Sequence, residues 1–345
     1  MTYPSSLRAF LGTAAVFALP WVVAGQAPAS GTSQAKRTET AAAPRTAGPR
    51  LPDGHPDFSG SWSYATATPL ERPKAFAGKA SLTDEEAAVF VKGLASGGCR
   101  ILKCDGSAAS KVATAYDDFW WDFGDKLTLN RTSLIVDPPD GLMPALTAAA
   151  QEQAKAAFAR RASAESPAGP EDLSLSDRCM MGFNSGPPLT PSAYNNNIHV
   201  FQTHDHIALM SEMIHNTRVV ALDGRPHLSA GFRQWAGDSR GRWEGDALVI
   251  ETTNFRPETA PGGGNHLTAR LVERLFRVSG DILMYEYRMD DPAIWTRPWT
   301  VQIPMTRNTQ PMYEYACHEG NYALANILKG ARADEQAARG KQAPR

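Results

Sequence analysis

Residues 197–222 read NIHVFQTHDHIALMSEMIHNTRVVAL. Apolar and polar side chains largely alternate over Ile198–Thr203 and Ile207–Ile214, and a third short run follows at Arg218–Leu222. Such alternation is the signature of a β-strand with one buried face. Because only a few turn-forming residues separate the runs, no helix fits between them. The stretch therefore predicts consecutive antiparallel strands joined by hairpins.

The same texture continues toward the C-terminus, where four further strands are expected, at Ala247–Phe255, Leu267–Val278, Ile282–Met289 and Trp299–Met305. An antiparallel meander of this kind either closes as a barrel or folds as a β-sandwich. We favour the barrel, because closure removes exposed strand edges. The fold class is thus mainly β, with a few peripheral helices.

Two helices are expected outside the meander, as insertions near 83–95 and 147–164. Thr83-Asp-Glu-Glu86 is a capping box, and the second segment is rich in Ala, Gln, Lys and Arg. A short helix is also expected at Tyr322–Leu328. We expect one β-rich domain over residues 51–330, followed by a disordered tail at 331–345.

The N-terminus has the pattern of a secretory signal peptide. Arg8 precedes an apolar run, Ala9–Val23, and small residues follow. The run is shorter than the roughly 20 residues needed to span a bilayer, so we expect cleavage after a signal at 1–27, with a flexible leader at 28–50. The mature protein is then periplasmic or secreted, with no membrane span.

Composition narrows the class of partner. Lys and Arg number 35 against 36 Asp and Glu, for a formal charge of −1. With so little net charge, the protein has no overall positive electrostatic field that would attract nucleic acid. The expected partner is a small molecule or an oligosaccharide, and the oligomeric state stays open.

Four cysteines in an exported chain suggest two disulfide bridges, with three possible pairings. Cys99 and Cys104 are close enough to close a local loop, which leaves Cys179 to pair with Cys317. No thiol then remains as a nucleophile or zinc ligand. The chain also lacks the common zinc, phosphate-loop and hydrolase motifs, so no metal or other cofactor is expected.

Three residues are candidates for acid–base catalysis. If Asp205 and His206 form a two-residue turn, His199 faces Glu212, and a carboxylate beside an imidazole makes a general base. A three-residue turn would instead put Ser211 opposite His199. His318, in the polar segment before the C-terminal helix, is the third candidate.

Candidate substrate-binding residues are amides, cations and aromatic rings near strand ends or on loops, where sites concentrate. They are Asn195, Asn196, Asn197, His215, Arg218, Arg233, Trp235 and Trp299. Glu251, Glu273 and Glu286 each interrupt an otherwise apolar strand, and we expect structural ion pairs there. Charge pairing favours Glu273 opposite Arg288.

Several motifs together resemble a large group of exported bacterial proteins, abundant in acidobacteria and proteobacteria, for which the resemblance supplies no activity or residue roles. The motifs are Asp53-Gly-His-Pro-Asp-Phe-Ser-Gly-Ser-Trp62, Phe119-Trp-Trp-Asp122, Asp177-Arg-Cys179, Gln202-Thr203, Glu212–His227, Gly241-Arg-Trp-Glu-Gly-Asp246, Leu271-Val-Glu-Arg274 and Trp295-Thr-Arg-Pro-Trp299. Gly60-Ser-Trp62 also resembles the first strand of lipocalin-like barrels, which implies the same closed meander.

The sequence leaves two functions open. One is an exported enzyme that acts on a polar carbohydrate-derived or hydroxylated aromatic small substrate by lyase-type or isomerase-type acid–base chemistry, without a covalent nucleophile. The alternative is a lipocalin-like envelope protein that binds an apolar or aromatic ligand. An enzyme needs several convergent ionisable groups, whereas a carrier lines its lumen with apolar ones. The Glu, Arg and His residues within strands favour the enzyme.

Overall fold

The computed structural model describes residues 48–94, 121–162, 167–261 and 267–342. The predicted signal peptide, almost all of the leader, and the predicted Cys99–Cys104 bridge lie outside these ranges. The strands are β1 (Gly60–Ser63), β2 (Ile135–Asp137), β3 (Asn197–Gln202), β4 (His206–Ser211), β5 (Thr217–Ala221), β6 (Asp238–Glu244), β7 (Ala247–Thr253), β8 (Leu271–Arg277), β9 (Ile282–Met289) and β10 (Trp299–Asn308). The helices are α1 (Asp84–Lys92), α4 (Ala148–Ala162) and α5 (Tyr322–Gln342), with 3₁₀ turns at Lys74–Phe76, Thr128–Asn130, Pro170–Asp172 and Met213–His215.

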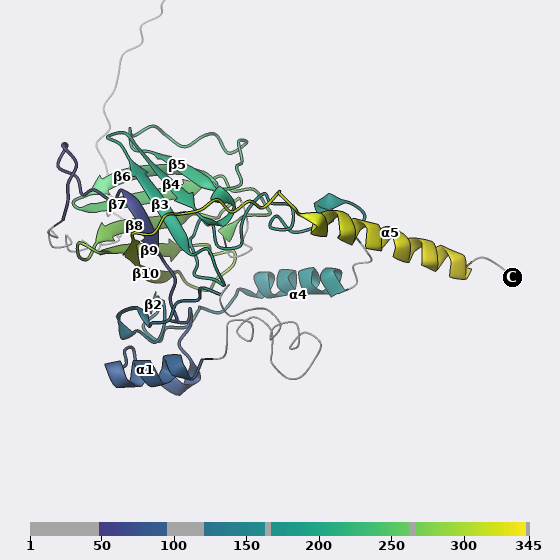
Figure 1. The fold of residues 1–345 in the computed structure, drawn as a ribbon, viewed down its shortest axis with the longest axis horizontal. Helices are drawn as coiled ribbons and strands as arrows, with labels where there is room; N and C mark the ends of the chain where they lie inside the picture. Colours follow the sequence, from purple (N-terminus) through teal and green to yellow (C-terminus); the bar gives the residue numbers. More distant parts are fainter. Residues whose placement is uncertain (1–47, 95–120, 163–166, 262–266, 343–345) are drawn as a thin grey trace, which may run out of the picture. The chain divides into compact units, whose positions relative to one another are not determined.

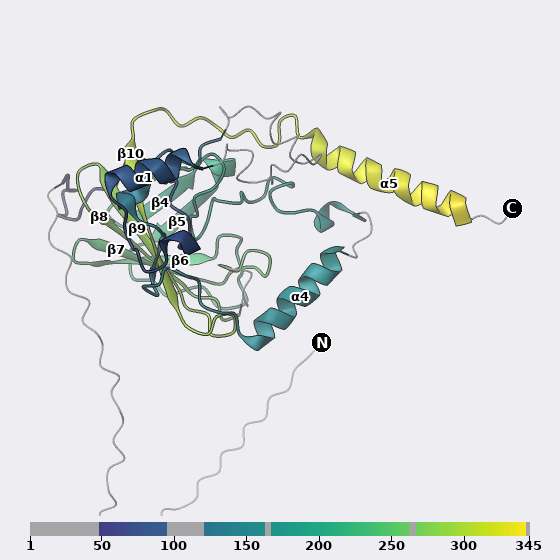
Figure 2. The same cartoon turned by 90° about the horizontal axis from the view of Figure 1, so that it is seen from below.

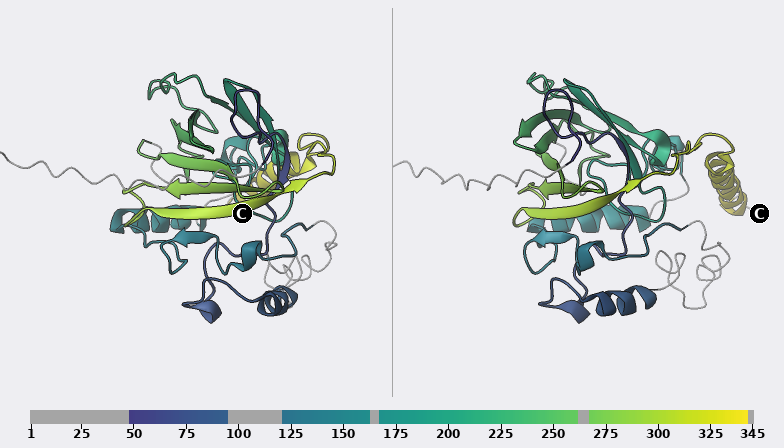
Figure 3. Two further views of the ribbon diagram at one scale, coloured as in Figure 1. Left: turned by 90° about the vertical axis from the view of Figure 1, so that its left-hand side faces the viewer. Right: turned by 60° about the vertical axis from the view of Figure 1, so that its left-hand side comes forward.

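The strands close into a barrel (Figures 1 and 3). Within the described ranges, nine strands follow the order β1-β3-β4-β5-β6-β7-β8-β9-β10, and β10 returns to β1. The closing pairs are Ser61 with Asn308, Trp62 with Arg307 and Ser63 with Thr306. β2 adds a tenth strand beside the first part of β10. The predicted barrel is therefore confirmed over the β-sandwich.

One neighbouring pair of strands is parallel. β5 meets β6 through Ala221 and Arg240, whereas every other pairing in the sheet is antiparallel. The chain leaves the barrel after β5 over residues 222–237 and re-enters in the same direction. An unbroken meander was expected, and this excursion is where the barrel departs from it.

Both predicted hairpin registers are wrong. In the β3–β4 hairpin His199 lies opposite Met210. The Thr203 N–H donates to the His206 carbonyl at 2.9 Å, so the two turn residues are His204 and Asp205, one position earlier than the predicted pair. The predicted His199–Glu212 pair therefore does not form. In the β8–β9 hairpin Glu273 lies opposite Tyr287 instead of Arg288.

The centre of the barrel is filled by side chains. Trp62, Leu248, Ile250 and Tyr285 are fully buried. Together with the other buried apolar residues of the strands they form the main hydrophobic core.

A buried polar cluster lies among these apolar side chains. The Arg218 guanidinium donates to both carboxylate oxygens of Glu273, one of them at 2.7 Å, and the Tyr285 hydroxyl donates to Glu273 at 2.7 Å. Burial, with the charge of Glu273, raises the pKa of Tyr285 well above its ordinary value, so the phenol stays a neutral donor. Arg218, predicted to bind substrate, instead neutralises Glu273 inside the barrel.

The expected strand ion pairs are present for the other two glutamates as well. Arg270 pairs with Glu251, and Arg274 Nε lies 3.8 Å from Glu286 Oε1. These two pairs are partly exposed, so each contributes little to stability.

The helices lie outside the barrel (Figures 1 and 2). The Thr83 capping box is present at the start of α1, and Ala87 of α1 belongs to a small separate apolar cluster with Ala67, Leu82 and Leu127. α5 continues to Gln342 where a disordered tail was expected, because its polar residues are mostly strong helix formers. None of the described helices is long and apolar enough to cross a membrane.

Cys179 and Cys317 form a disulfide, as predicted. It joins the segment before β3 to the segment before α5. A disulfide is typical of proteins that fold in an oxidising compartment.

Candidate functional site

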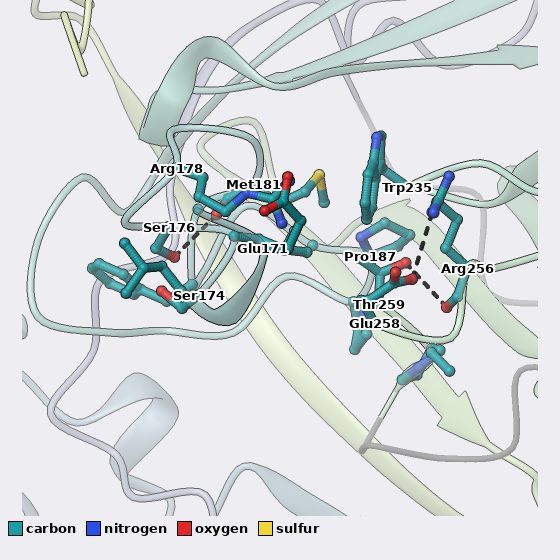
Figure 4. A pocket seen from close by; sticks show the side chains of 18 residues that line it. Glu171, Ser174, Ser176, Arg178, Met181, Pro187, Trp235, Arg256, Glu258 and Thr259 are labelled. Carbon is teal, nitrogen blue, oxygen red and sulfur yellow. Dashed lines mark hydrogen bonds and ion pairs between the residues drawn. The ribbon is translucent and has the colours of Figure 1, made fainter. Parts of the chain in front are cut away.

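Cavities of about 790, 350 and 290 Å³ border the segment 182–191. The first is a cleft, shown in Figure 4. One wall comes from residues 171–188, and the other from Trp235 and residues 256–261. Segments far apart in the sequence thus build it.

The cleft combines an aromatic ring with both signs of charge. The Arg256 guanidinium lies over the Trp235 ring, 4.1 Å from its centre, and Arg256 Nε is 3.5 Å from Glu258 Oε2. Glu171 and Arg178 lie on the opposite side (Figure 4). Such a lining suits a polar ligand that has one apolar face.

The two carboxylates of the cleft differ in their hydrogen-bond partners. The pKa of Glu258 is lowered, mainly because its own backbone N–H donates to it, with smaller effects from Arg256 and Arg178. Glu258 therefore stays ionised at neutral pH. The Glu171 carboxylate makes no hydrogen bond or ion pair with the described residues, so it is available to a ligand.

The cavity of about 290 Å³ is mostly apolar, and it shares Leu70, Thr190 and Tyr287 with the neighbouring cavity of about 350 Å³. It is lined by Leu70, Met143, Leu146, Pro188, Thr190, Tyr287, Met289, Trp295 and Trp299. Pro188 also lines the cleft, so the segment 182–191 borders both spaces.

Side-chain amides and the barrel core hold this segment in place. The Leu189 N–H donates to the Tyr285 hydroxyl at 3.0 Å. Buried Asn196 donates to the Ser192 carbonyl at 2.8 Å and accepts from the Ser192 N–H at 2.8 Å. Gly182 lies so close to Met213 that a Cβ there would be 2.0 Å from Met213 Cγ. Asn196, predicted to bind substrate, thus shapes the wall of the site.

The residues predicted from the sequence do not share one site. His199 Nδ1 lies 2.8 Å from Ser61 Oγ, Asn197 donates to Glu212 at 2.7 Å, and the Asn195 carbonyl accepts from Asn184 at 3.2 Å. His215 and His318 are exposed, and Arg233 donates to the Phe255 carbonyl at 3.2 Å. Trp235 lines the cleft and Trp299 lines the apolar cavity.

A histidine that the sequence analysis left out of its candidates has a carboxylate partner. His227 Nδ1 lies 2.9 Å from Asp238 Oδ2, and Arg240 Nη1 lies 2.7 Å from Asp238 Oδ1. The Leu228 N–H donates to the same carboxylate at 2.9 Å. Neither His227 nor Asp238 lines either cavity. This group fastens the segment 222–237 to β6.

Asp122 and Glu212 are two acidic residues that interact electrostatically. Partial desolvation, with the charges of Glu212 and Asp125, raises the pKa of Asp122. A carboxyl whose folded pKa is raised contributes stability at low pH, and that contribution is lost as the pH rises through the folded pKa. Ionised Asp122 therefore opposes folding at neutral pH.

Replacing Asp122 by asparagine should consequently raise the melting temperature at pH 7. The gain should shrink as the pH falls toward 3.5, because the wild-type carboxyl is then protonated. Thermal unfolding of both proteins at the two pH values measures this. Asp334→Asn, on exposed α5, is the control and should show no such dependence. An Asp122→Asn protein less stable than wild type at pH 7 would contradict the assignment.

Among the described residues, no group of three or more His, Cys, Asp or Glu side chains is arranged to hold a metal ion. Neither a protein-family model nor a curated protein matches the chain.

Sequence reasoning missed Glu171, Arg178, Arg256 and Glu258 because they lie on segments without strand or helix periodicity. Trp235 was the one predicted site residue in the cleft, although Arg178 stands in the motif Asp177-Arg-Cys179. The sequence does not show which charged residues will line the same cavity as a given tryptophan.

Proposed function

We propose that the protein is an exported enzyme that acts on a polar, carbohydrate-derived substrate in the cleft. The observation that carries the proposal is the convergence of Glu171, Arg178 and Glu258 on a space that also contains Trp235 and Arg256. Apolar C–H faces of a sugar pack on aromatic rings, while its hydroxyls bond to carboxylates and guanidinium groups.

Each group has a distinct role in this proposal. Glu258, which stays ionised, accepts hydrogen bonds from substrate hydroxyls. Arg178 and Arg256 stabilise negative charge on a substrate oxygen. Glu171 exchanges the proton: it removes one from a substrate carbon and returns it to the leaving oxygen in a lyase, or to another carbon in an isomerase. No covalent intermediate is required.

Replacing Trp235 by alanine should weaken saccharide binding roughly tenfold or more, because it removes the aromatic surface of the cleft. Calorimetry with a set of mono- and disaccharides, including uronic acids, measures the affinity. Trp243→Ala is the matched control, because Trp243 stacks on His55, 4.4 Å between ring centres, and does not line the cleft. Equal losses in both variants would contradict a role for the cleft.

Catalysis is tested separately from binding. Glu171→Gln should keep saccharide affinity within a few-fold of wild type while turnover falls by about 100-fold or more, the usual range for loss of a general acid–base group. Product formation is followed by mass spectrometry. If no saccharide in the set binds, or if Glu171→Gln turns over at the wild-type rate, the proposed enzyme is wrong.

A further inference from the structure

The apolar cavity differs from the cleft in the chemistry of its walls. No Asp, Glu, Lys, Arg or His lines it, and its surface is dominated by Met, Leu and aromatic side chains. It therefore cannot compensate the burial of a charge. An occupant has to be neutral and largely apolar.

Three aromatic rings line this cavity in a chain of edge-to-face contacts. The ring centres of Tyr287 and Trp299 are 6.1 Å apart, and those of Trp299 and Trp295 are 5.5 Å apart, with planes at 71° and 70°. Edge-to-face geometry is the preferred contact between aromatic rings. Another flat ring can join such a group with the same geometry.

The two tryptophans also carry unused hydrogen-bond donors. Trp295 and Trp299 are 4 % and 5 % exposed, and neither indole N–H has a hydrogen-bond partner. Buried polar groups are nearly always paired, so each exception calls for an explanation. A ligand with a hydroxyl or carbonyl oxygen supplies the missing acceptor if an indole turns its N–H toward the cavity.

The other two polar side chains that line the cavity, Tyr287 and Thr190, are neutral and hydrogen-bond to each other. Burial raises the pKa of Tyr287 well above its ordinary value, and Thr190 hydrogen-bonds to its hydroxyl. The polar groups among the lining residues are thus all neutral. An engineered cavity of about 150 Å³ accepts benzene, so about 290 Å³ is enough for one or two fused rings.

We propose that this cavity is a second ligand site, which takes a small neutral aromatic molecule with one oxygen substituent, such as a phenol or a naphthol. The site is separate from the cleft and does not depend on the saccharide chemistry proposed there. Pro188, which lines both spaces, is the point at which they adjoin.

The test is calorimetric titration of the purified full-length chain with 2-naphthol, with 2-naphthoate as the charged analogue. We expect one molecule of 2-naphthol per chain, with a dissociation constant on the order of 10–100 μM for a ligand of this size. Binding of 2-naphthoate should be at least tenfold weaker, because its charge would lose hydration without gaining a partner.

Two tryptophan substitutions locate the site. Met143→Trp fills the cavity from its half-buried rim and should weaken 2-naphthol binding by tenfold or more. Leu142→Trp, at an exposed neighbouring position outside the lining, is the matched control and should bind like wild type. Their melting temperatures show whether either change disturbs the fold.

Trp235→Ala separates this proposal from the cleft. It should leave 2-naphthol affinity unchanged, whatever it does to saccharides. The proposal is overturned if wild type takes up no 2-naphthol, if Met143→Trp binds it as tightly as wild type, or if Trp235→Ala abolishes the binding.

Discussion

Replacing Glu273 by alanine is expected to lower the free energy of unfolding by about 3–5 kcal/mol, the usual cost of breaking a buried ion pair from one side. Glu273 is fully buried, and its carboxylate accepts from Arg218 and Tyr285. Without it, the Arg218 guanidinium stays in the barrel centre with its charge uncompensated. Equilibrium denaturation in urea measures the loss.

The double variant Arg218→Met with Glu273→Leu is the control. Replacing both charges by apolar groups of similar size removes the unpaired charge, so the double variant should be clearly more stable than Glu273→Ala. A loss below about 1 kcal/mol for Glu273→Ala, the range of exposed pairs, would show that water reaches this cluster.

Removing the Cys179–Cys317 disulfide should lower the free energy of unfolding by about 2–5 kcal/mol. The bond spans 138 residues of sequence, and a cross-link that closes so long a loop restricts the unfolded chain strongly. Urea denaturation of the Cys179→Ser, Cys317→Ser double variant measures the change. Because Cys179 lies within the wall of the cleft formed by residues 171–188, saccharide affinity should fall as well.

The two single serine variants provide the comparison for the disulfide. Each breaks the same bond, so each should lose nearly as much stability as the double variant. A double variant that unfolds at the wild-type urea concentration would mean that other contacts already fix the two segments in the native state.

The β-barrel and its helix caps could be predicted because they depend on local patterns. Short strand-like runs identified β3–β5 and β7–β10, and the Thr83 capping box marked the start of α1. Register could not be predicted, because it depends on one residue at a turn. A hydrogen bond from the Thr203 N–H decides the β3–β4 turn, and alternation does not report it.

The candidate site was harder to predict because polar residues serve two purposes. Arg218 and Asn196 have the side chains of ligand-binding residues, yet both are buried and bonded within the fold. Residue type does not distinguish a satisfied buried group from one that faces a ligand. The prediction succeeded for Trp235 and Trp299, which are large aromatic residues on or beside loops and which line the cleft and the apolar cavity.

Closure of the barrel sets the order of events during synthesis. Its last seam joins residues 61–63 to residues 306–308, near the two ends of the chain. Contacts so distant in sequence form slowly, and this seam cannot form until the ribosome has completed β10. Until then β1 has no partner at this seam, and unpaired strand edges are prone to aggregation. A nascent chain truncated before β10 should therefore depend on chaperones to stay in solution, whereas the finished chain should not.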